Sequence, residues 1–422
     1  MRLRLLLAAL AARASHAVLN ATVRNGVLSV PGHPDAPLAP TFTALQAAIA
    51  AYFLPLPPPA PANHSLVQAP LYSFLTLDGG AWTADAPLAL APSLLLVLAG
   101  GLVIAPAPDF PPSRGMLELN GTAYTGVVAP GGPGDALFAC ANASVSPAAV
   151  WAVGSDNLYL EGLGVFGCGR TGGGALHVQG EPMAWGPTAT GAVITGCRIW
   201  NSSRAVWLET VGGVAVHGNE LFNNSGHCLD FDAFSHLSSA TNNAIYGNFG
   251  REGIFIEQGA VGITVANNTI GPVRAGPRPR RARAGAPLYR SLSRLFSALS
   301  PPPPSQGNGN GIAVFNNDMN VTTASHFIVA NTIFGNLNAG IALGSTAPRA
   351  GQPNVGVHIA GNTLYGNGEA RRQGVHTNGA QEGTRISANS NADGISKFTQ
   401  VGFRGANITL LDPFNREIPL DY

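Results

Sequence analysis

The chain has 422 residues, of which 45% are hydrophobic and 11% are charged, and its formal net charge at pH 7 is +1. This composition is typical of a folded protein with a large core and excludes a chain that is disordered as a whole. A net charge so close to zero gives no electrostatic basis for binding nucleic acid, so we expect no nucleic-acid partner.

Residues 1–17 are typical of a secretory signal peptide. Arg2 and Arg4 form a basic region, an apolar stretch follows, and small residues from Ser15 to Ala17 offer a cleavage site. We therefore expect a secreted protein of the extracellular space or the cell wall. Nine Asn-x-Ser/Thr sequons agree with a glycoprotein, although an asparagine-rich repeat also produces such sequons by chance.

Residues 18–70 are predicted to form an N-terminal cap followed by a proline linker. Residues 41–51 indicate a short helix that Thr43 caps. Its apolar face is predicted to hold Leu45, Ile49 and Tyr52. A solenoid needs its open end covered, and an amphipathic helix is the usual cover.

One stretch has the length and hydrophobicity of a membrane span. Residues 87–108 carry no charge and are about 20 residues long, which is enough to cross a bilayer. However, Pro92, Gly100 and Gly101 interrupt the stretch, and its leucines recur at even spacing. These features favour successive buried strands, so we expect no membrane span.

Residues 191–393 repeat one pattern. Each copy has an alternating apolar strand, then Gly, Asn or Cys, then a second apolar run and a corner rich in Asn and Gly. The anchor position of the pattern recurs at Cys197, Asn219, Asn243, Asn268, Asn331, Asn362 and Asn389. A period of about two dozen residues is the signature of a solenoid with three short strands per coil. Asparagine at a recurrent inward corner predicts a ladder of amides that bond from coil to coil.

The step from Asn268 to Asn331 is much wider than the others. We assign it to one further rung at residues 309–317 and to an insertion at residues 271–306. The insertion is rich in arginine and proline and is expected to be disordered, with a basic arm that holds an acidic polysaccharide as the alternative. The coils are thus predicted to fill residues 71–410, and residues 411–422 form a C-terminal tail.

The cysteines leave the disulfide pattern open. Cys140, Cys168, Cys197 and Cys228 allow three pairings, and one or two disulfides are plausible in a secreted chain. Cys197 sits at an anchor position, where a buried free thiol fits equally well.

Acidic residues are predicted to form a column on the second strand of three consecutive coils. Strand side chains alternate between two faces, so the aliphatic positions point inward and the acids point outward. The column holds Glu209, Asp232 and Glu257, with Asp230 beside it. Coils lie about 4.8 Å apart and alternate strand residues about 6.6 Å apart, so four such carboxylates cannot all ionise freely. Either one keeps a proton, or a cation such as Ca²⁺ binds Glu209, Asp232 and Glu257.

Further candidates flank the acidic column. Catalysis is assigned to Asp230, Asp232, Glu257, His227 and Arg251, and substrate binding to Trp207, Arg204, Phe255 and His376. This assignment requires the carboxylates to be accessible on one side of the coil. A solvated acidic face and ordinary aromatic packing are the alternatives.

The opening helix TALQAAIAA, the segment LDGGAWTADAPLALAPSLLLVLAGGLVI and the coil series resemble the right-handed parallel β-helix superfamily of pectate-lyase-like proteins. The coils are also similar to NosD-like and right-handed β-helix repeats. The resemblance covers roughly residues 40–400 and implies an all-β, single-stranded right-handed parallel β-helix with an N-terminal capping helix.

A weaker similarity links residues 229–254 to mannuronan C5-epimerases. That family carries an Asp-Pro-His-Asp motif there, and in this chain Asp230 matches the first Asp, while Asp232 replaces the His and Ala233 the final Asp. The resemblance implies a uronate lyase or C5-epimerase that acts on an acidic polysaccharide. In such a scheme His227 or Asp232 is the base, and Arg251 or a bound cation neutralises the uronate carboxylate.

Two other functions stay open. A glycoside hydrolase of polygalacturonase type would use Asp230 together with Asp232 or Glu257 as its carboxylate pair. A non-catalytic solenoid that binds glycans or belongs to the cell wall needs no such pair. In each case we expect a monomer.

Overall fold

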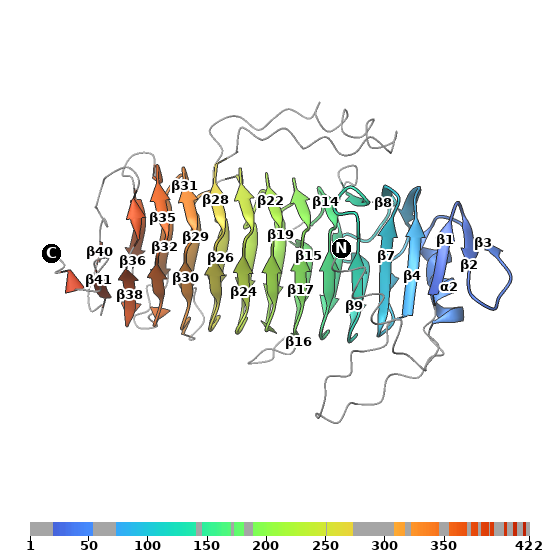
Figure 1. Cartoon of the computed structure of the whole chain (residues 1–422), viewed down its shortest axis with the longest axis horizontal. Helices are drawn as coiled ribbons and strands as arrows, with labels where there is room; N and C mark the ends of the chain where they lie inside the picture. Colours follow the sequence, from blue (N-terminus) through green and yellow to red (C-terminus); the bar gives the residue numbers. More distant parts are fainter. Residues whose placement is uncertain are drawn as a thin grey trace, which may run out of the picture.

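The computed structural model describes residues 20–53, 73–140, 146–169, 173–180, 189–249, 251–272, 308–316, 322–345, 354–368, 373–378, 381–387, 389–391, 401–402, 408–411 and 417–418. Over these residues the chain is a long parallel β-solenoid whose strands stand side by side along the molecular axis (Figure 1). The predicted signal peptide, the proline linker and the insertion beyond Pro272 lie outside the described residues.

Three long sheets, here named A, B and C, each take one strand from a regular coil, as the period predicted. Sheet A runs in the order β3 (Ala36–Pro37), β2 (Val27–Ser29), β1 (Asn20–Arg24), β4 (Ser73–Asp78), β7 (Leu94–Ala99), β10 (Gly126–Val128), β13 (Tyr159–Glu161), β17 (Val193–Thr195), β21 (Ala215–His217), β24 (Ser239–Thr241), β27 (Thr264–Ala266), β30 (Phe327–Val329), β34 (His358–Ala360), β38 (Thr384–Ser387), β41 (Ile408–Leu411) and β42 (Glu417–Ile418). Sheet B runs in the order β5 (Ala81–Ala84), β8 (Leu102–Pro106), β11 (Ala136–Ala139), β14 (Gly164–Phe166), β18 (Arg198–Trp200), β22 (Glu220–Phe222), β25 (Ala244–Tyr246), β28 (Thr269–Gly271), β31 (Thr332–Phe334), β35 (Thr363–Tyr365) and β39 (Ser390–Asn391).

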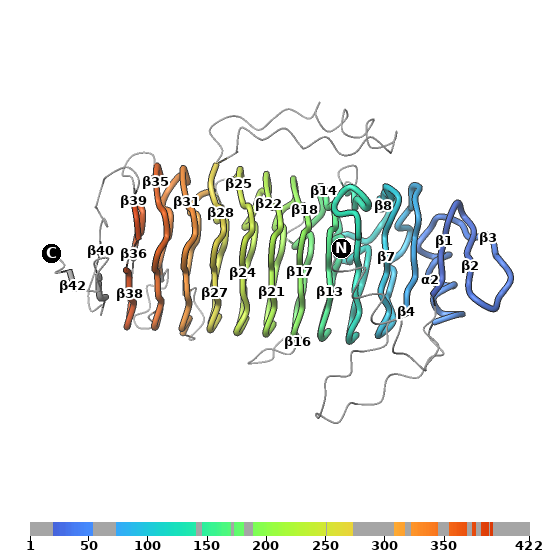
Figure 2. The backbone as a smooth tube through the Cα atoms, in the orientation of Figure 1, coloured from blue at the N-terminus to red at the C-terminus, as the bar shows by residue number. Residues whose placement is uncertain are grey.

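Sheet C carries the candidate site. Its strands are β6 (Leu88–Ala89), β9 (Gly115–Asn120), β12 (Ala148–Val153), β15 (Gly174–Gln179), β19 (Arg204–Glu209), β23 (Leu229–Asp232), β26 (Ile254–Glu257), β29 (Ile312–Asn316), β32 (Ala339–Ser345), β36 (Gln373–Asn378) and β40 (Val401–Gly402). Two short pairs complete the solenoid, β16 (Ala189–Thr190) with β20 (Val211–Gly212) and β33 (Asn354–Val355) with β37 (Gln381–Glu382). Figure 2 shows successive coils lying side by side along the long axis.

The core is one column of mainly aliphatic side chains inside the coil, with some aromatic rings such as that of Phe231. Alternate residues of each strand point inward, and the inward residues of β19, β23 and β26 are fully buried. They are Val206, Leu208, Leu229, Phe231, Ile254 and Ile256. Because the period of a strand is two, a register slip of one residue would turn this set toward the outside, so burial fixes which residues face outward.

The predicted asparagine ladder is confirmed. The Asn219 Nδ2 donates to the Asn243 Oδ1 at 3.0 Å, and Asn243 donates in the same way to Asn268 at 3.0 Å. The ladder continues through Asn331 and Asn362 to Asn389. Each amide also satisfies a buried backbone carbonyl of a neighbouring coil, such as that of Val216 for Asn243. The ladder therefore locks the register of adjacent coils.

The prediction of a separate rung at residues 309–317 is wrong. The Asn268 Nδ2 donates directly to the Asn331 Oδ1 at 3.0 Å, so these residues belong to adjacent coils. β29 is the third strand of the coil that β27 and β28 begin, and the insertion leaves that coil after sheet B. Its two ends meet, because the Asn308 Nδ2 donates to the Gly271 carbonyl at 3.0 Å.

A second amide ladder, which we did not predict, runs five residues after the first. It joins Asn224, Asn248, Asn308, Asn336 and Asn367. This ladder is also continuous across the insertion, because Asn248, which precedes the insertion, donates to Asn308, which follows it. The sequence carries its signal, since an Asn follows five residues after each of four first-ladder positions.

The N-terminal cap combines a helix with strands that the sequence did not indicate. The helix is α2 (Phe42–Tyr52), and its cap is Thr41 rather than Thr43, because Thr41 is extended and its Oγ1 accepts from the Ala44 N–H at 3.3 Å. The helix packs on β5 and β6 at the end of the solenoid (Figure 1). β1 pairs in parallel with β4 and extends sheet A past the first coil.

Cys140 and Cys168 form a disulfide with an S–S distance of 2.04 Å, which selects one of the pairings left open. Cys197 and Cys228 are buried free thiols, and burial raises the pKa of each to about 12. The apolar stretch that imitates a membrane span forms β6, β7 and β8. Among the described residues, no helix is long and apolar enough to cross a membrane.

Replacing Asn243 by Ala should lower the free energy of unfolding by about 3 kcal/mol, because the Val216 carbonyl and the Asn219 amide lose buried partners. Denaturant unfolding of Asn243→Ala measures this cost. The control is Thr241→Ala on the outer face of sheet A. Equal small losses in both variants would show that the ladder does not hold the coils together.

His326 makes stability pH-dependent. It is fully buried, its Nδ1 accepts from the Ile263 N–H at 3.2 Å, and burial lowers its pKa from 6.5 to about 3. The free energy of unfolding that neutral His326 contributes is therefore fully present above about pH 6.5. It is lost as the pH falls toward 3, because the unfolded state binds a proton that the folded state does not. His326→Ser keeps an acceptor, because Ser238 accepts from the Val214 N–H two coils earlier in the same column. We expect the stability lost between about pH 7 and pH 5 to shrink by about 2 kcal/mol in this variant. An unchanged pH profile of urea unfolding would contradict this role.

Candidate functional site

The predicted acids lie at outward positions of sheet C. Asp230 is in register with Trp207 on β19 and with Phe255 on β26, and Asp232 is in register with Glu209. Their neighbours Leu229 and Phe231 point into the core. The alternation of strand side chains therefore sets the direction of the acids, as the sequence predicted.

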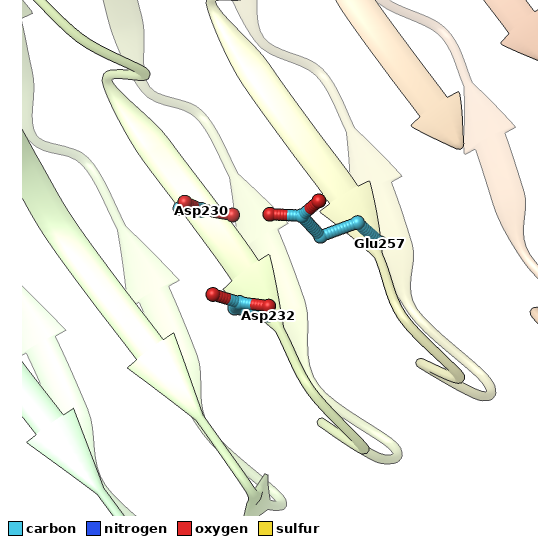
Figure 3. Close-up of side chains that lie close together, drawn as sticks. All are labelled: Asp230, Asp232 and Glu257. Carbon is cyan, nitrogen blue, oxygen red and sulfur yellow. The ribbon is translucent and has the colours of Figure 1, made fainter. Parts of the chain in front are cut away.

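Three of the acids converge. One carboxylate oxygen each from Asp230, Asp232 and Glu257 lies within 4.8 Å of the others, and Figure 3 shows the three side chains close together on two neighbouring strands. Glu209 is not in this group, since its carboxylate lies 3.6 Å from the His177 Nε2. We call Asp230, Asp232 and Glu257 the acidic triad.

The acidic triad is buried, which corrects the expectation of an accessible column. Asp230 is 0% exposed, Asp232 8% and Glu257 5%. A solvated acidic face is thus excluded for these three residues. Because they are buried, their carboxylates cannot flank a substrate bond in this conformation.

Burial and mutual repulsion perturb the carboxylates. Burial first, and then the charge of Asp232, raise the pKa of Asp230 well above its usual value, against the opposing effect of Arg204. Burial also raises the pKa of Asp232, although the Ala233 N–H at 2.7 Å and the Trp207 Nε1 at 3.0 Å both donate to it. Neutral or counterbalanced carboxyl groups are therefore favoured here.

A divalent cation fits the donor set of the acidic triad. Arg204 offers the triad a guanidinium, whose Nε lies 3.3 Å from the Asp230 Oδ2 and whose charge also lowers the pKa of Asp232. If Asp230 and Asp232 are both ionised, their two negative charges and the one positive charge of Arg204 leave a net charge of −1. The Asp230 Oδ1 is buried without a hydrogen-bond partner among the described residues. Carboxylate oxygens are the ligands of hard cations such as Ca²⁺ and Mg²⁺.

Trp207 has both ring faces covered. His177 on β15 stacks on it at 4.1 Å between ring centroids, and the Arg204 guanidinium lies 4.2 Å from its centroid and reaches toward Asp230 on the other side. Trp151 extends the stack beyond His177 at 5.3 Å. A sugar could thus meet the edge of the Trp207 ring but not its face.

A second group of side chains lies beside the acidic triad, just before the same strands. The His227 Nδ1 lies 2.7 Å from the Glu252 Oε2, and the His227 ring stacks on Phe255 at 4.4 Å. The side chains of His227 and Glu252 are 13% and 17% exposed. Glu252 was not predicted as a site residue, because it precedes β26 and does not belong to the acidic column. Its spacing was an available signal, since Glu252 follows His227 by one full coil.

The remaining candidates differ in exposure and in distance from the acidic triad. Phe255 is 8% exposed, so its ring is largely covered. Arg251 is exposed and lies just before β26. His376 is on β36, four strands from β23, or about 19 Å away at about 4.8 Å per strand. It lies too far from the acidic triad to contact the same sugar residue.

Residues 140–272 match the family described as right handed beta helix region. Among solved structures, the A-module of a mannuronan C-5 epimerase from Azotobacter vinelandii is similar at 14% identity and a TM-score of 0.43, covering 88% of this chain and 84% of that chain. An exopolygalacturonase from Thermotoga maritima is similar at 8% identity and a TM-score of 0.46, covering 80% of this chain and 83% of that chain.

A tailspike protein variant of an E. coli bacteriophage, in complex with a pentasaccharide, is similar at 10% identity and a TM-score of 0.48, covering 87% of this chain and 61% of that chain. No curated protein matches this sequence. The fold is a right-handed parallel β-helix, in agreement with the resemblance seen in the sequence.

Replacing Asp230 by Asn should change the free energy of unfolding by less than about 1 kcal/mol in protein stripped of divalent cations, because Asn resembles the neutral acid that the site favours. Chemical denaturation in EDTA measures the change. Leu229→Ala on the same strand is the control and should cost about 2 to 5 kcal/mol. A loss of about 3 to 5 kcal/mol in Asp230→Asn would instead mean that an ionised Asp230 pairs with Arg204.

Proposed function

We propose that this protein acts on an acidic polysaccharide as a uronate lyase or C5-epimerase at the outer face of sheet C. The proposal is carried by one observation: a guanidinium and an imidazole, each next to its own carboxylate, lie on adjacent coils at the rim of the acidic triad. The side chains of Arg204 and His227 keep 23% and 13% of their surface exposed. They are therefore the groups that a substrate can reach.

The reaction requires three catalytic functions from the protein. The negative charge of the uronate carboxylate must be offset, the C5 proton must be removed, and a proton must be given to the leaving oxygen or returned to C5. Arg204 offsets the carboxylate charge, and the exposed Arg251 extends positive charge along a polyuronate. The His227 Nε2 takes the C5 proton, since its Nδ1 faces Glu252.

The bonds balance for both outcomes. The C5–H bond breaks, its proton goes to the His227 Nε2, and the electron pair is delocalised into the neutralised carboxylate. In a lyase the C4–O bond then breaks, a C4=C5 double bond forms, and the glycosidic oxygen takes the proton that the His227 Nε2 had accepted. In an epimerase water gives a proton to the opposite face of C5, and the resulting hydroxide is neutralised by the proton on the His227 Nε2, so no other bond changes.

The acidic triad would repel such a substrate unless its charge is offset. We propose that Asp230, Asp232 and Glu257 hold a divalent cation, with Ca²⁺ as the candidate. The cation supplies positive charge next to the substrate carboxylate when it is bound. In its absence the raised pKa values of Asp230 and Asp232 favour protonation, which offsets part of the same charge.

A glycoside hydrolase is less well supported. That reaction requires two carboxyl groups in contact with the two sides of a glycosidic bond. Asp230, Asp232 and Glu257 are the acids proposed for it, and all three are buried. Secretion, which we propose from residues 1–17, would bring the protein to extracellular polysaccharides.

The test is turnover of polymannuronate and polygalacturonate with Ca²⁺ or with EDTA. We expect unsaturated uronate absorbance or inversion at C5, with Ca²⁺ raising the rate of the wild type and Asp230→Asn losing most of that increase. His227→Ala should lower kcat about 10²- to 10⁴-fold. The control is Glu220→Gln, which alters an ion pair with Arg198 on sheet B.

Three results would contradict the proposal. Reducing ends without unsaturated product would identify a hydrolase. Tight binding to either polymer without any product would favour a non-catalytic glycan-binding solenoid. Full activity in His227→Ala would exclude the proposed base.

A further inference from the structure

Glu252 enters the function proposed above only as the neighbour of His227, yet its own contacts extend across four coils. One of its oxygens, Oε2, lies 2.7 Å from the His227 Nδ1. The other, Oε1, accepts from the Asn310 Nδ2 at 3.3 Å. Asn310 is fixed in turn, because its Oδ1 accepts from the Ala339 N–H at 3.2 Å. A continuous chain of polar contacts thus runs from His227 through Glu252 and Asn310 to the backbone of β32.

The two hydrogen bonds of Asn310 have a determined direction. The Ala339 N–H can only donate, so the amide oxygen of Asn310 faces Ala339 and its NH₂ group faces Glu252. Burial acts to raise the pKa of Glu252, but the interactions with His227, with its own backbone and with Asn310 outweigh burial and lower the pKa. Two lone pairs would repel each other at the 2.7 Å that separates the His227 Nδ1 from the Glu252 Oε2, so the contact favours a hydrogen on Nδ1.

Packing also fixes the plane of the imidazole ring. The Phe255 ring lies 4.4 Å from the His227 ring with an angle of 20° between the planes. Rotation of His227 would break both this stacking and the contact with Glu252. The ring is thus held in one orientation before any substrate arrives, which is the condition for efficient general-base catalysis.

We propose that Glu252, supported by Asn310, is a positioning residue that keeps the proton of neutral His227 on Nδ1 and leaves the lone pair of Nε2 free to take the proton of the substrate. The inference rests on the proposed function for the identity of the reaction. The tautomer itself is a property of the protein alone and can be measured without substrate.

The chain offers a substitution that reverses the tautomer without changing shape. In Glu252→Gln the amide oxygen stays with the Asn310 NH₂ group, so the new NH₂ group faces the His227 Nδ1. That nitrogen must then accept, and the proton moves to Nε2, where it blocks the base.

A second substitution, Asn310→Asp, removes the donor at position 310. In the double variant Glu252→Gln/Asn310→Asp, the amide NH₂ group at position 252 faces the new carboxylate at position 310. The amide oxygen at position 252 then faces the His227 Nδ1, and the original tautomer returns.

The experiment measures the His227 tautomer by NMR on isotope-labelled histidine, with His227→Ala to assign the signal, and measures kcat and KM on polymannuronate and polygalacturonate. We expect a proton on Nδ1 in the wild type, on Nε2 in Glu252→Gln, and on Nδ1 again in Glu252→Gln/Asn310→Asp. In the single variant kcat should fall about 10²- to 10⁴-fold with little change in KM, and the double variant should recover most of it. Glu220→Gln should change neither quantity.

The two proposals fail in different ways. A wild-type proton on Nε2, or a Glu252→Gln variant with unchanged tautomer and kcat, would overturn the positioning role even if the protein turns over a polyuronate. The expected tautomers in a protein that turns over neither polymer would support the positioning role and refute the proposed reaction. Circular dichroism and the Tm of each variant show that a change in kcat does not arise from unfolding.

Discussion

The in-register stacking of parallel coils is the constraint on which the rest of this structure depends. Two asparagine ladders and an aliphatic core prevent one coil from sliding along the next. Whatever residue occupies an outward position therefore lies about 4.8 Å from its equivalents on both neighbouring coils. Like charges placed there cannot move apart.

The candidate site follows from that constraint. Asp230 and Asp232 share one strand, and Glu257 lies on the adjacent strand. The register therefore places three buried carboxyl groups close together. Protonation or nearby positive charge stabilises such a group, and the Arg204 Nε lies 3.3 Å from the Asp230 Oδ2. More exposed side chains lie at the rim, where His227 and Glu252 form a second pair on the same coils.

Features set by periodicity could be predicted from the sequence. The solenoid, three strands per coil, the first asparagine ladder and the outward direction of the acids all follow from alternation and spacing. The second ladder could have been found in the same way, since its signal repeats five residues after the first. The effect of the insertion on the number of coils could not be predicted, because only the direct contact between Asn268 and Asn331 shows that no coil intervenes.

Features set by neighbouring side chains could not be predicted. Burial of Asp230 depends on how Arg204 and Trp207 pack over it, and no strand pattern reports this. The contact of Glu209 with His177, in place of the predicted cation site, likewise depends on neighbouring side chains that the strand pattern does not report. The helix cap is Thr41 instead of Thr43 because backbone conformation, rather than residue type, selects the cap.

The most direct test is anomalous diffraction from crystals grown with Mn²⁺ in place of Ca²⁺. We expect an anomalous peak bounded by carboxylate oxygens of Asp230, Asp232 and Glu257, and we expect this peak to be lost in crystals of Asp230→Asn. A map at saturating Mn²⁺ with no peak among these three side chains would contradict the claim that the stacked acids assemble a cation site.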